Sequence, residues 1–246
     1  MKFEDMINKI TLGDSYKLIK DIPDKSIDLI IIDPPYYFQK GGLGIFKDRH
    51  TRYMDAIEEK NLNDNYDLSI IDELCRVMKA INIYIWCNKI QIHQYLNYFE
   101  HKNCSNEFII WEKTNPVPTI NNTYVNDKEY CLYFREYGKT KLYGNYETRR
   151  TIYRTKCNKT DKDKYKHPTI KPLKIIKNLI INSSKKGDIV LDCFSGSGTT
   201  CVAAKELNRR YIGIEIDKQY YEISVDRLNG MLADGQISFD TDITKL

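Results

Sequence analysis

The chain has 246 residues, of which 41% are hydrophobic and 29% charged, and its formal net charge is +4. This size suits one large α/β domain, and the composition is ordinary for a soluble globular protein. A net charge of +4 is too small to indicate nucleic-acid binding, and no stretch approaches the roughly 18 apolar residues that a membrane span needs.

Strands and helices alternate in the first half of the chain. Residues 26–33 form a run of mostly β-branched side chains that ends at Pro34, which predicts a strand buried on both faces that stops abruptly. Apolar residues at helical spacing predict a helix over 67–78, and residues 81–86 predict a second buried strand. Three further elements are expected on the same grounds: a helix over 92–99 and strands over 107–111 and 129–134.

Residues 135–166 interrupt this alternation. The segment is polar, basic and rich in tyrosine without sustained periodicity, which predicts an irregular or β-hairpin excursion from the sheet. The longer stretch 135–171 holds twelve lysines and arginines against four acidic residues. We therefore interpret 135–166 as a candidate recognition insertion within a single domain that spans 1–246.

The alternation resumes after this segment. A helix is expected to begin with Pro172 and run to 181, followed by a buried strand over 188–192. Residues 199–208 then predict a helix, and 211–215 a further strand. Strands that alternate with helices favour an α/β, doubly wound fold, in which helices cover both faces of a mostly parallel sheet.

A glycine-containing loop follows the strand over 188–192. It runs from Cys193 to Gly198, and Glu215 lies 19 positions after Gly196 (215 minus 196). In dinucleotide-binding units, a carboxylate at this spacing ends the second strand and accepts hydrogen bonds from ribose. A tight turn without a ligand is one alternative. A nicotinamide site is another, although Cys201 replaces the third glycine or alanine of that pattern. The loop therefore predicts a nucleoside-containing ligand.

The tetrapeptide Asp33-Pro34-Pro35-Tyr36 carries a second signal. An exocyclic amine on adenine or cytosine is a poor nucleophile, because its lone pair is delocalised into the ring. We expect the Asp33 carboxylate and the Pro34 carbonyl to accept one N–H bond each from such an amine. Pro35 makes that carbonyl rigid, and Tyr36 is placed to stack on the base. A base in a duplex must first be extruded into the pocket. A packed turn without chemistry is the alternative.

Together the two motifs resemble those of bacterial and phage DNA amino-methyltransferases, which carry (D/N/S)-P-P-(Y/F) and F-x-G-x-G. The tetrapeptide precedes the glycine loop, and residues 167–173 lie just before that loop, as in the beta group of the family. The similarity extends from Gly13-Asp14 through 111–116 to 214–217. Two departures are Cys193, where the usual pattern is D-P-F, and the shortness of the candidate recognition insertion.

The resemblance implies a seven-stranded Rossmann-like sheet, S-adenosylmethionine as the cofactor, no metal, DNA as the partner, and frequently a homodimer. A cognate restriction enzyme would be a second partner. Catalysis falls to Asp33, Pro34, Pro35 and Tyr36. The implied cofactor contacts are Asp14, Thr169, Asp192, Phe194, Gly196, Gly198, Thr199, Thr200 and Glu215. For Asp14, a plain turn after Gly13 is the alternative.

Basic residues in two segments are expected to contact DNA. Residues 40–49 follow the tetrapeptide and contain three glycines, which suits a lid, with a merely exposed loop as the alternative. Tyr143, Tyr146 and Tyr153 are expected beside bases. The residues expected to hold phosphates are Lys47, Arg49, Arg52, Arg149, Arg150 and Arg154. For any one of these residues, a solvated surface position is the alternative.

Site-specific DNA adenine-N6 methylation is the leading interpretation, because aspartate at the first position of the tetrapeptide favours adenine in this family. Cytosine-N4 methylation is the near alternative. The intact Asp33 and Tyr36 count against a catalytically silent DNA-binding or cofactor-sensing relative. Asp33 also counts against protein-glutamine methylation, whose enzymes prefer asparagine there, whereas RNA is disfavoured only by the motif order.

The N-terminus and the cysteines indicate a reducing compartment. The N-terminus is acidic and polar within its first few residues and lacks the apolar core of a secretory signal, so we expect a cytoplasmic protein. The seven cysteines include no C-x-x-C pair, and no histidine stands at zinc-ligand spacing from them. We expect reduced core thiols and no structural zinc.

Overall fold

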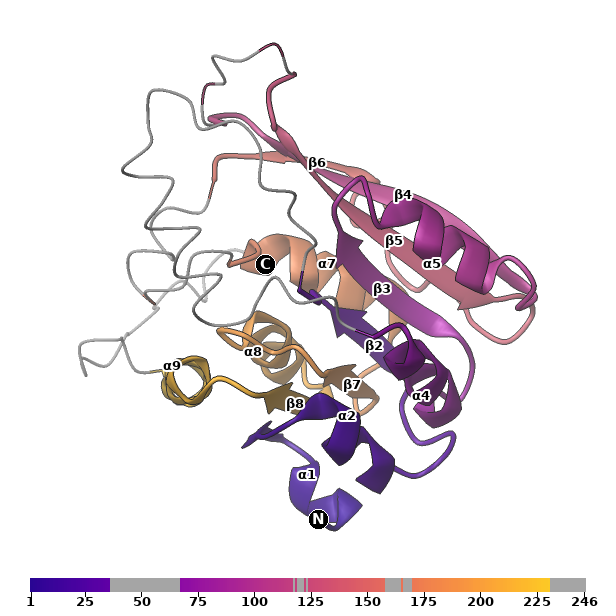
Figure 1. Ribbon diagram of the computed structural model, residues 1–246, viewed down its shortest axis with the longest axis vertical. Coiled ribbons are helices and arrows are strands. Elements are labelled where there is room, and N and C mark those ends of the chain that lie inside the picture. Colours follow the sequence, from indigo (N-terminus) through magenta and orange to yellow (C-terminus); the bar gives the residue numbers. More distant parts are fainter. Residues whose placement is uncertain are drawn as a thin grey trace.

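Eight strands form one sheet in the described part of the chain, in the order β1-β8-β7-β2-β3-β5-β4-β6 (Figure 1). The computed structural model describes residues 1–35, 67–116, 118, 122, 124–157, 165 and 170–230. The strands are β1 (Lys9–Leu12), β2 (Leu29–Ile32), β3 (Asn82–Cys87), β4 (Cys104–Lys113), β5 (Lys128–Glu136), β6 (Ile152–Thr155), β7 (Ile189–Asp192) and β8 (Arg210–Glu215).

The sheet is mostly parallel. Of the described strands only β5 runs against its neighbours, pairing antiparallel with β3 and with β4. The chain moves from β2 to β3 in one direction across the sheet and from β7 to β8 in the other, so the order reverses between β2 and β7. Ligands of doubly wound sheets bind outside the carboxyl ends of the strands at such a switch point. Asp33 follows β2 and the glycine loop follows β7, so both predicted motifs lie there.

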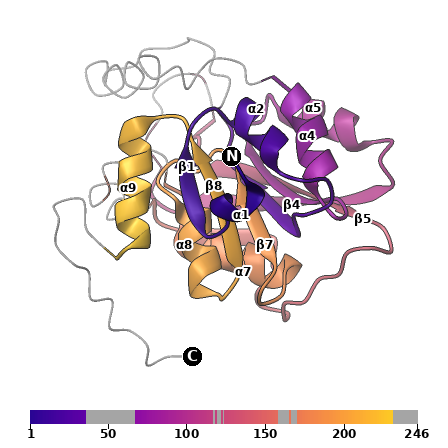
Figure 2. The same cartoon turned by 90° about the horizontal axis from the view of Figure 1, so that it is seen from below.

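Helices cover both faces of the sheet (Figure 2). One face packs under α4 and α5, and the other under α7 and α8. The described helices are α1 (Phe3–Met6), α2 (Ser15–Leu18), α4 (Ser69–Val77), α5 (Ile92–Phe99), α7 (Leu173–Ser183), α8 (Thr199–Glu206) and α9 (Lys218–Leu228), with a 3-10 helix, η1, over Ile19–Asp21. Among the described residues, no helix is both long and apolar enough to cross a membrane.

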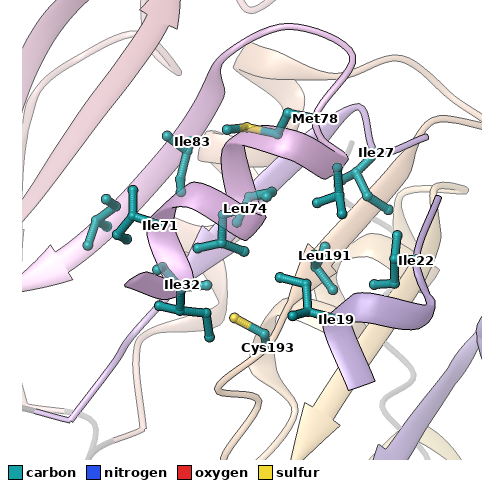
Figure 3. Packing of buried hydrophobic residues seen from close by; sticks show 14 of the residues in the cluster. Ile19, Ile22, Ile27, Ile32, Ile71, Leu74, Met78, Ile83, Leu191 and Cys193 are labelled. Carbon is teal, nitrogen blue, oxygen red and sulfur yellow. The ribbon is translucent and has the colours of Figure 1, made fainter. Parts of the chain in front are cut away.

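Side chains of the central strands alternate between two hydrophobic clusters. In β2, Ile30 and Ile32 join the cluster under α4 and α5, whereas Leu29 and Ile31 join the cluster under α7 and α8. Figure 3 shows the first cluster, in which Leu74 of α4 packs with residues of β2, β3 and β7. A strand covered on both faces needs apolar side chains at every position, which explains the continuous β-branched run in the sequence.

All strands and helices predicted from the sequence are present, with ends that differ by a few residues. The sheet has eight strands in the described part of the chain rather than the seven that the resemblance implies. Within the candidate recognition insertion, β6 pairs in parallel with β4 and forms an edge of the sheet. The described part of that segment is therefore not a β-hairpin, because its strand returns to the sheet beside β4 instead of pairing with a strand of its own.

All seven cysteines lie among the described residues, and all are free thiols. Four of them, Cys87, Cys131, Cys193 and Cys201, are buried. Burial raises the pKa of these thiols, to about 12 for Cys87, because a thiolate loses its hydration in the core. They are therefore neutral packing groups, as expected from their places in apolar runs.

Gly213 in β8 packs closely against side chains of β1 and α8. A Cβ atom there would lie 2.7 Å from Ile10 Cγ1 and 2.8 Å from Cys201 Sγ. We expect Gly213→Ala to lower the free energy of unfolding by about 1–3 kcal/mol, since the packed neighbours must shift. Urea denaturation measures this loss. In a double-mutant cycle with Ile10→Ala, the loss in the double variant should be smaller than the sum of the two single losses, and strict additivity would contradict the contact.

Candidate active site

A cavity of about 410 Å³ opens at the carboxyl ends of β2, β7 and β8. Small-molecule sites commonly measure roughly 300–1,000 Å³. Segments far apart in the sequence meet around it, as the switch point of the sheet requires. The predicted site residues that line it are Asp14, Asp33, Pro35, Asp192, Phe194, Gly196, Thr199, Thr200 and Glu215. Pro34 and Gly198 are described but do not line it.

The turn after β2 presents Asp33 to the cavity. β2 ends at Ile32, and the prolines prevent the chain from continuing the strand. Gln91, which is buried, donates a hydrogen bond from Nε2 to the carbonyl oxygen of Pro35 over 3.3 Å. The Asp33 carboxylate forms a close ion pair with the ammonium group of Lys171. The turn is thus fixed by a buried amide and its carboxylate by a buried cation.

The loop between β7 and α8 depends on two glycines in the left-handed region. The φ angles of Gly196 and Gly198 are +49° and +75°, a backbone conformation that residues with a Cβ atom rarely adopt. The Gly198 N–H donates to the Ser195 carbonyl over 2.7 Å, which closes the turn. The Ser195 N–H donates to Ile214 of β8 over 3.0 Å, so the loop is attached to the neighbouring strand.

Glu215 is the last residue of β8, and its carboxylate bonds to the backbone of this loop. Its Oε2 accepts from the Gly196 N–H at 2.6 Å, and its Oε1 accepts from the Asp217 N–H at 2.8 Å. The residue is 7% exposed, and burial raises its pKa in spite of these two bonds. Each carboxylate oxygen has a second lone pair, so both can also accept from a ligand hydroxyl.

Asp192 ends β7 beside Glu215. Its Oδ1 accepts from the Phe194 N–H at 3.1 Å. Burial raises the pKa of Asp192 to about 7, against the hydrogen bonds from Thr200 and Phe194 that lower it. A cation bound next to this carboxyl group would therefore favour its ionised form near neutral pH.

Asp14 caps α2 at the edge of the cavity. Its Oδ1 accepts from the Tyr16 N–H at 2.9 Å, which satisfies a free donor in the first helical turn. The neighbouring Ser15 hydroxyl donates to the Cys193 carbonyl oxygen. The turn role that we considered for Asp14 is present in the structure, and the same turn lies against the glycine loop.

Arg227 of α9 was not predicted from the sequence. It is 7% exposed, and its Nη1 lies 3.2 Å from the Ser197 carbonyl oxygen and 2.7 Å from Thr199 Oγ1. Its guanidinium group lies 4.6 Å from the centre of the Tyr165 ring. Helical spacing with the buried Tyr220 marks Arg227 as part of the inner face of α9, and that spacing is the one sequence signal for it. Arg227 therefore ties α9 to the glycine loop and to the first residue of α8.

Trp86 of β3 and Lys171 also line the cavity and were not predicted as site residues. Lys171 belongs to the segment 167–173 that carries part of the family resemblance, and this is the sequence signal that would have found it. Five predicted residues lie outside the described part of the chain: Tyr36, Lys47, Arg49, Arg52 and Thr169. The predicted lid over 40–49 lies outside it as well.

The three described arginines expected to contact DNA lie away from the cavity walls. Arg154 is on β6, at the edge of the sheet, where its Nε lies 3.0 Å from Glu112 Oε1. Arg149 donates to the Leu142 carbonyl over 2.6 Å, and Arg150 lies 3.6 Å from Glu147. All three are exposed. They form a basic edge of the molecule, and their contact with DNA stays a prediction.

A family model described as DNA methylase matches residues 27–226, which include both the Asp33 turn and the glycine loop. The chain belongs to this family. It is a DNA methyltransferase, as the resemblance implied. The similarity to the type II methyltransferase M.HinfI of Haemophilus influenzae is 33% identity over 91% of this chain and 69% of the relative. For the type II methyltransferase M2.MboI of Moraxella bovis it is 32%, over 91% of this chain and 88% of the relative.

Solved structures of DNA methyltransferases share the fold. The M1.HpyAVI–SAM complex is 27% identical, with a TM-score of 0.67, over 89% of this chain and 98% of that chain. The cytosine-N4-specific PvuII DNA methyltransferase also has a TM-score of 0.67, over 89% of this chain and 85% of that chain. At 18% identity, this second likeness concerns the fold alone. The doubly wound, mostly parallel sheet expected from the sequence is thus the fold of these enzymes.

Proposed function

We propose that this DNA methyltransferase transfers a methyl group from S-adenosylmethionine to the N6 amine of adenine within a specific DNA sequence. The observation that carries the proposal is the position of Asp33. Its carboxylate lines the same cavity as the glycine loop and Glu215, so an amine bound to Asp33 and a nucleoside bound to Glu215 would share one cavity. M1.HpyAVI, which has this fold, was crystallised with SAM.

The residues around the cavity fit S-adenosylmethionine. Carboxylates predominate among the charged groups of its described lining, which favours a cationic ligand. Glu215 would hold the ribose hydroxyls through its two oxygens, and Asp192 would face positive charge on the ligand. The glycines leave room for a close approach to the loop backbone. When bound, S-adenosylmethionine supplies a methyl group on a positively charged sulfur, and the bonding electron pair stays on sulfur when the amine nitrogen takes the carbon.

Asp33 activates the amine in this proposal. Its carboxylate accepts one N–H bond and the Pro34 carbonyl accepts the other, which returns electron density to the nitrogen. Buried Gln91 keeps the turn in place by its bond to Pro35. No strong base is required, because the nitrogen becomes acidic after alkylation and loses its proton to water. The aspartate at the head of the tetrapeptide favours adenine over cytosine.

DNA is the substrate of the family, and we assign its binding to the basic edge and to the predicted phosphate-binding residues. Arg149, Arg150 and Arg154 are exposed, the ion pairs of Arg150 and Arg154 are weak, and phosphates can replace the present partners of all three. The proposal also includes a homodimer, which the family resemblance implies, and a cognate restriction enzyme, in keeping with the type II relatives. Light scattering tests for the homodimer. Expression of this chain together with the neighbouring genes tests for the restriction enzyme.

The experiment that tests the function is incubation of the enzyme with S-adenosylmethionine and unmethylated plasmid, followed by mass spectrometry of the nucleosides. N6-methyl-2′-deoxyadenosine is the expected product. N4-methyl-2′-deoxycytidine would move the target to cytosine, and the absence of both would refute the proposal. Parallel reactions on RNA and on protein test substrate class, and sequencing that detects modified bases identifies the target site.

A further inference from the structure

Lys171 is a buried ammonium group in the wall of the cavity. Its side chain is 6% exposed, it pairs with Asp33, and its Nζ lies 3.2 Å from Glu129 Oε2. The same Nζ lies 5.2 Å from the centre of the Trp86 ring. Taking an ammonium group out of water costs several kcal/mol unless anions compensate it, so this position requires its two partners.

Glu129 already has a second cation. Lys113 Nζ lies 2.6 Å from Glu129 Oε1. Burial acts to raise the pKa of Glu129, but Lys171 and Lys113 lower it to about 2. Two lysines and two carboxylates thus form one group with no net charge. Because the charge of Lys113 balances that of Glu129, the charge of Lys171 balances that of Asp33.

The surroundings of Asp33 make this compensation necessary. The described residues that line the cavity include five carboxylates, Asp14, Asp33, Asp67, Asp192 and Glu215, and one cation, Lys171. The Asp192 carboxyl group is a buried acidic neighbour of Asp33, and the thiols of Cys87 and Cys131 on the packed strands are neutral neighbours. A like charge and burial favour a protonated carboxyl group, which is a weaker acceptor for the N–H of an amine than the anion is.

We propose that Lys171 is a positioning residue for methyl transfer: it keeps Asp33 ionised and holds its carboxylate in one orientation toward the target amine. The inference rests on the proposed role of Asp33. Burial acts to lower the pKa of Lys171, but the nearby Asp33 and Glu129 outweigh it and raise that pKa well above its usual value. Lys171 is therefore charged throughout the pH range of the reaction, and its effect on Asp33 is constant.

The anionic form of Asp33 is present at high pH and is lost as the pH falls, and Lys171 moves that loss to lower pH. For Lys171→Met we expect the acidic limb of kcat/KM to move toward neutral pH, with kcat at neutral pH lower by roughly 10–100-fold, the scale seen when a supporting partner of a site residue is removed. The KM for the cofactor should stay unchanged. Lys171→Arg should restore the acidic limb.

A double variant separates this role from a structural one. Lys171→Met with Glu129→Gln removes one cation and one anion, so the net charge of the group is unchanged. We expect it to regain thermal stability relative to Lys171→Met but to keep the shifted acidic limb. If it also regains the wild-type limb, Lys171 serves Glu129 rather than Asp33 and the inference is wrong. Cofactor binding by calorimetry checks that each variant is folded.

Infrared difference spectroscopy tests the ionisation without any turnover. As the pH is lowered, Lys171→Met should show the carbonyl band of a protonated carboxylic acid at a pH where the wild type does not, and Lys171→Met with Asp33→Asn should lack it. Identical bands in the wild type and Lys171→Met would overturn the inference. This arm gives its answer even if the wild type methylates no DNA, so failure of the inference and failure of the proposed function are distinguishable.

Discussion

Replacing Asp33 with alanine is expected to lower kcat by on the order of 10²–10³-fold, the effect of removing one preorganised group at a reacting centre. In the proposed mechanism the carboxylate contacts the amine at the cavity wall, whereas Glu215 bonds to the glycine loop, so the affinity for S-adenosylmethionine should change little. Single-turnover methylation of a DNA duplex measures the loss, and calorimetry measures the affinity. Asp33→Asn should retain more activity than Asp33→Ala, because its amide oxygen still accepts one hydrogen bond.

Asp33→Ala is expected to lower stability as well as activity, because Asp33 pairs with the buried Lys171. A second substitution, at Lys171, separates the two effects. Asp33→Ala removes a counter-ion of the buried Lys171, so the unfolding midpoint of the variant should fall. Adding Lys171→Met should recover part of the midpoint and none of the activity. A double variant that regained activity would mean that Asp33→Ala had acted through folding, and full activity of Asp33→Ala itself would refute the mechanism.

Much of the fold was predictable because most of its core strands carry a continuous apolar run. β2, β3 and β7 are buried at every position, and burial on both faces requires such runs. β1 and β6 were not predicted. Each has four residues with partly exposed side chains, and a strand that short at the edge of a sheet has no periodicity to detect. Each of these two strands pairs with a strand that is remote in the sequence, β1 with β8 and β6 with β4.

The candidate site was predictable where chemistry depends on local spacing. The distance from Gly196 to Glu215 was visible in the sequence, and the structure joins these two residues by a 2.6 Å hydrogen bond. Lys171 and Arg227 were not visible in this way. Their roles arise from partners up to 138 positions away, and a single lysine or arginine is normally a solvated surface residue. Pairing between remote charges therefore had to come from the structure.

Replacing Glu215 with glutamine is expected to weaken the binding of S-adenosylmethionine by roughly 10–100-fold, the loss of a hydrogen bond to a charged acceptor. Glutamine keeps the shape of the side chain but has one acceptor oxygen, so its NH₂ group would face the N–H of either Gly196 or Asp217. Calorimetry measures the affinity. Glu222→Gln, on the exposed side of α9, is the matched control and should leave the affinity unchanged.

The neutral product S-adenosylhomocysteine tells which part of the ligand Glu215 holds. A carboxylate that accepts from the ribose makes the same contacts with both compounds, since they share the adenosine group. Glu215→Gln should therefore weaken the two by the same factor. A loss confined to S-adenosylmethionine would mean that Glu215 acts on the sulfonium charge instead, and an unchanged affinity for both would remove Glu215 from the binding site. An unchanged affinity would also mean that the spacing between Gly196 and Glu215 does not indicate ligand binding. Glu215 would then serve only to hold the glycine loop in place.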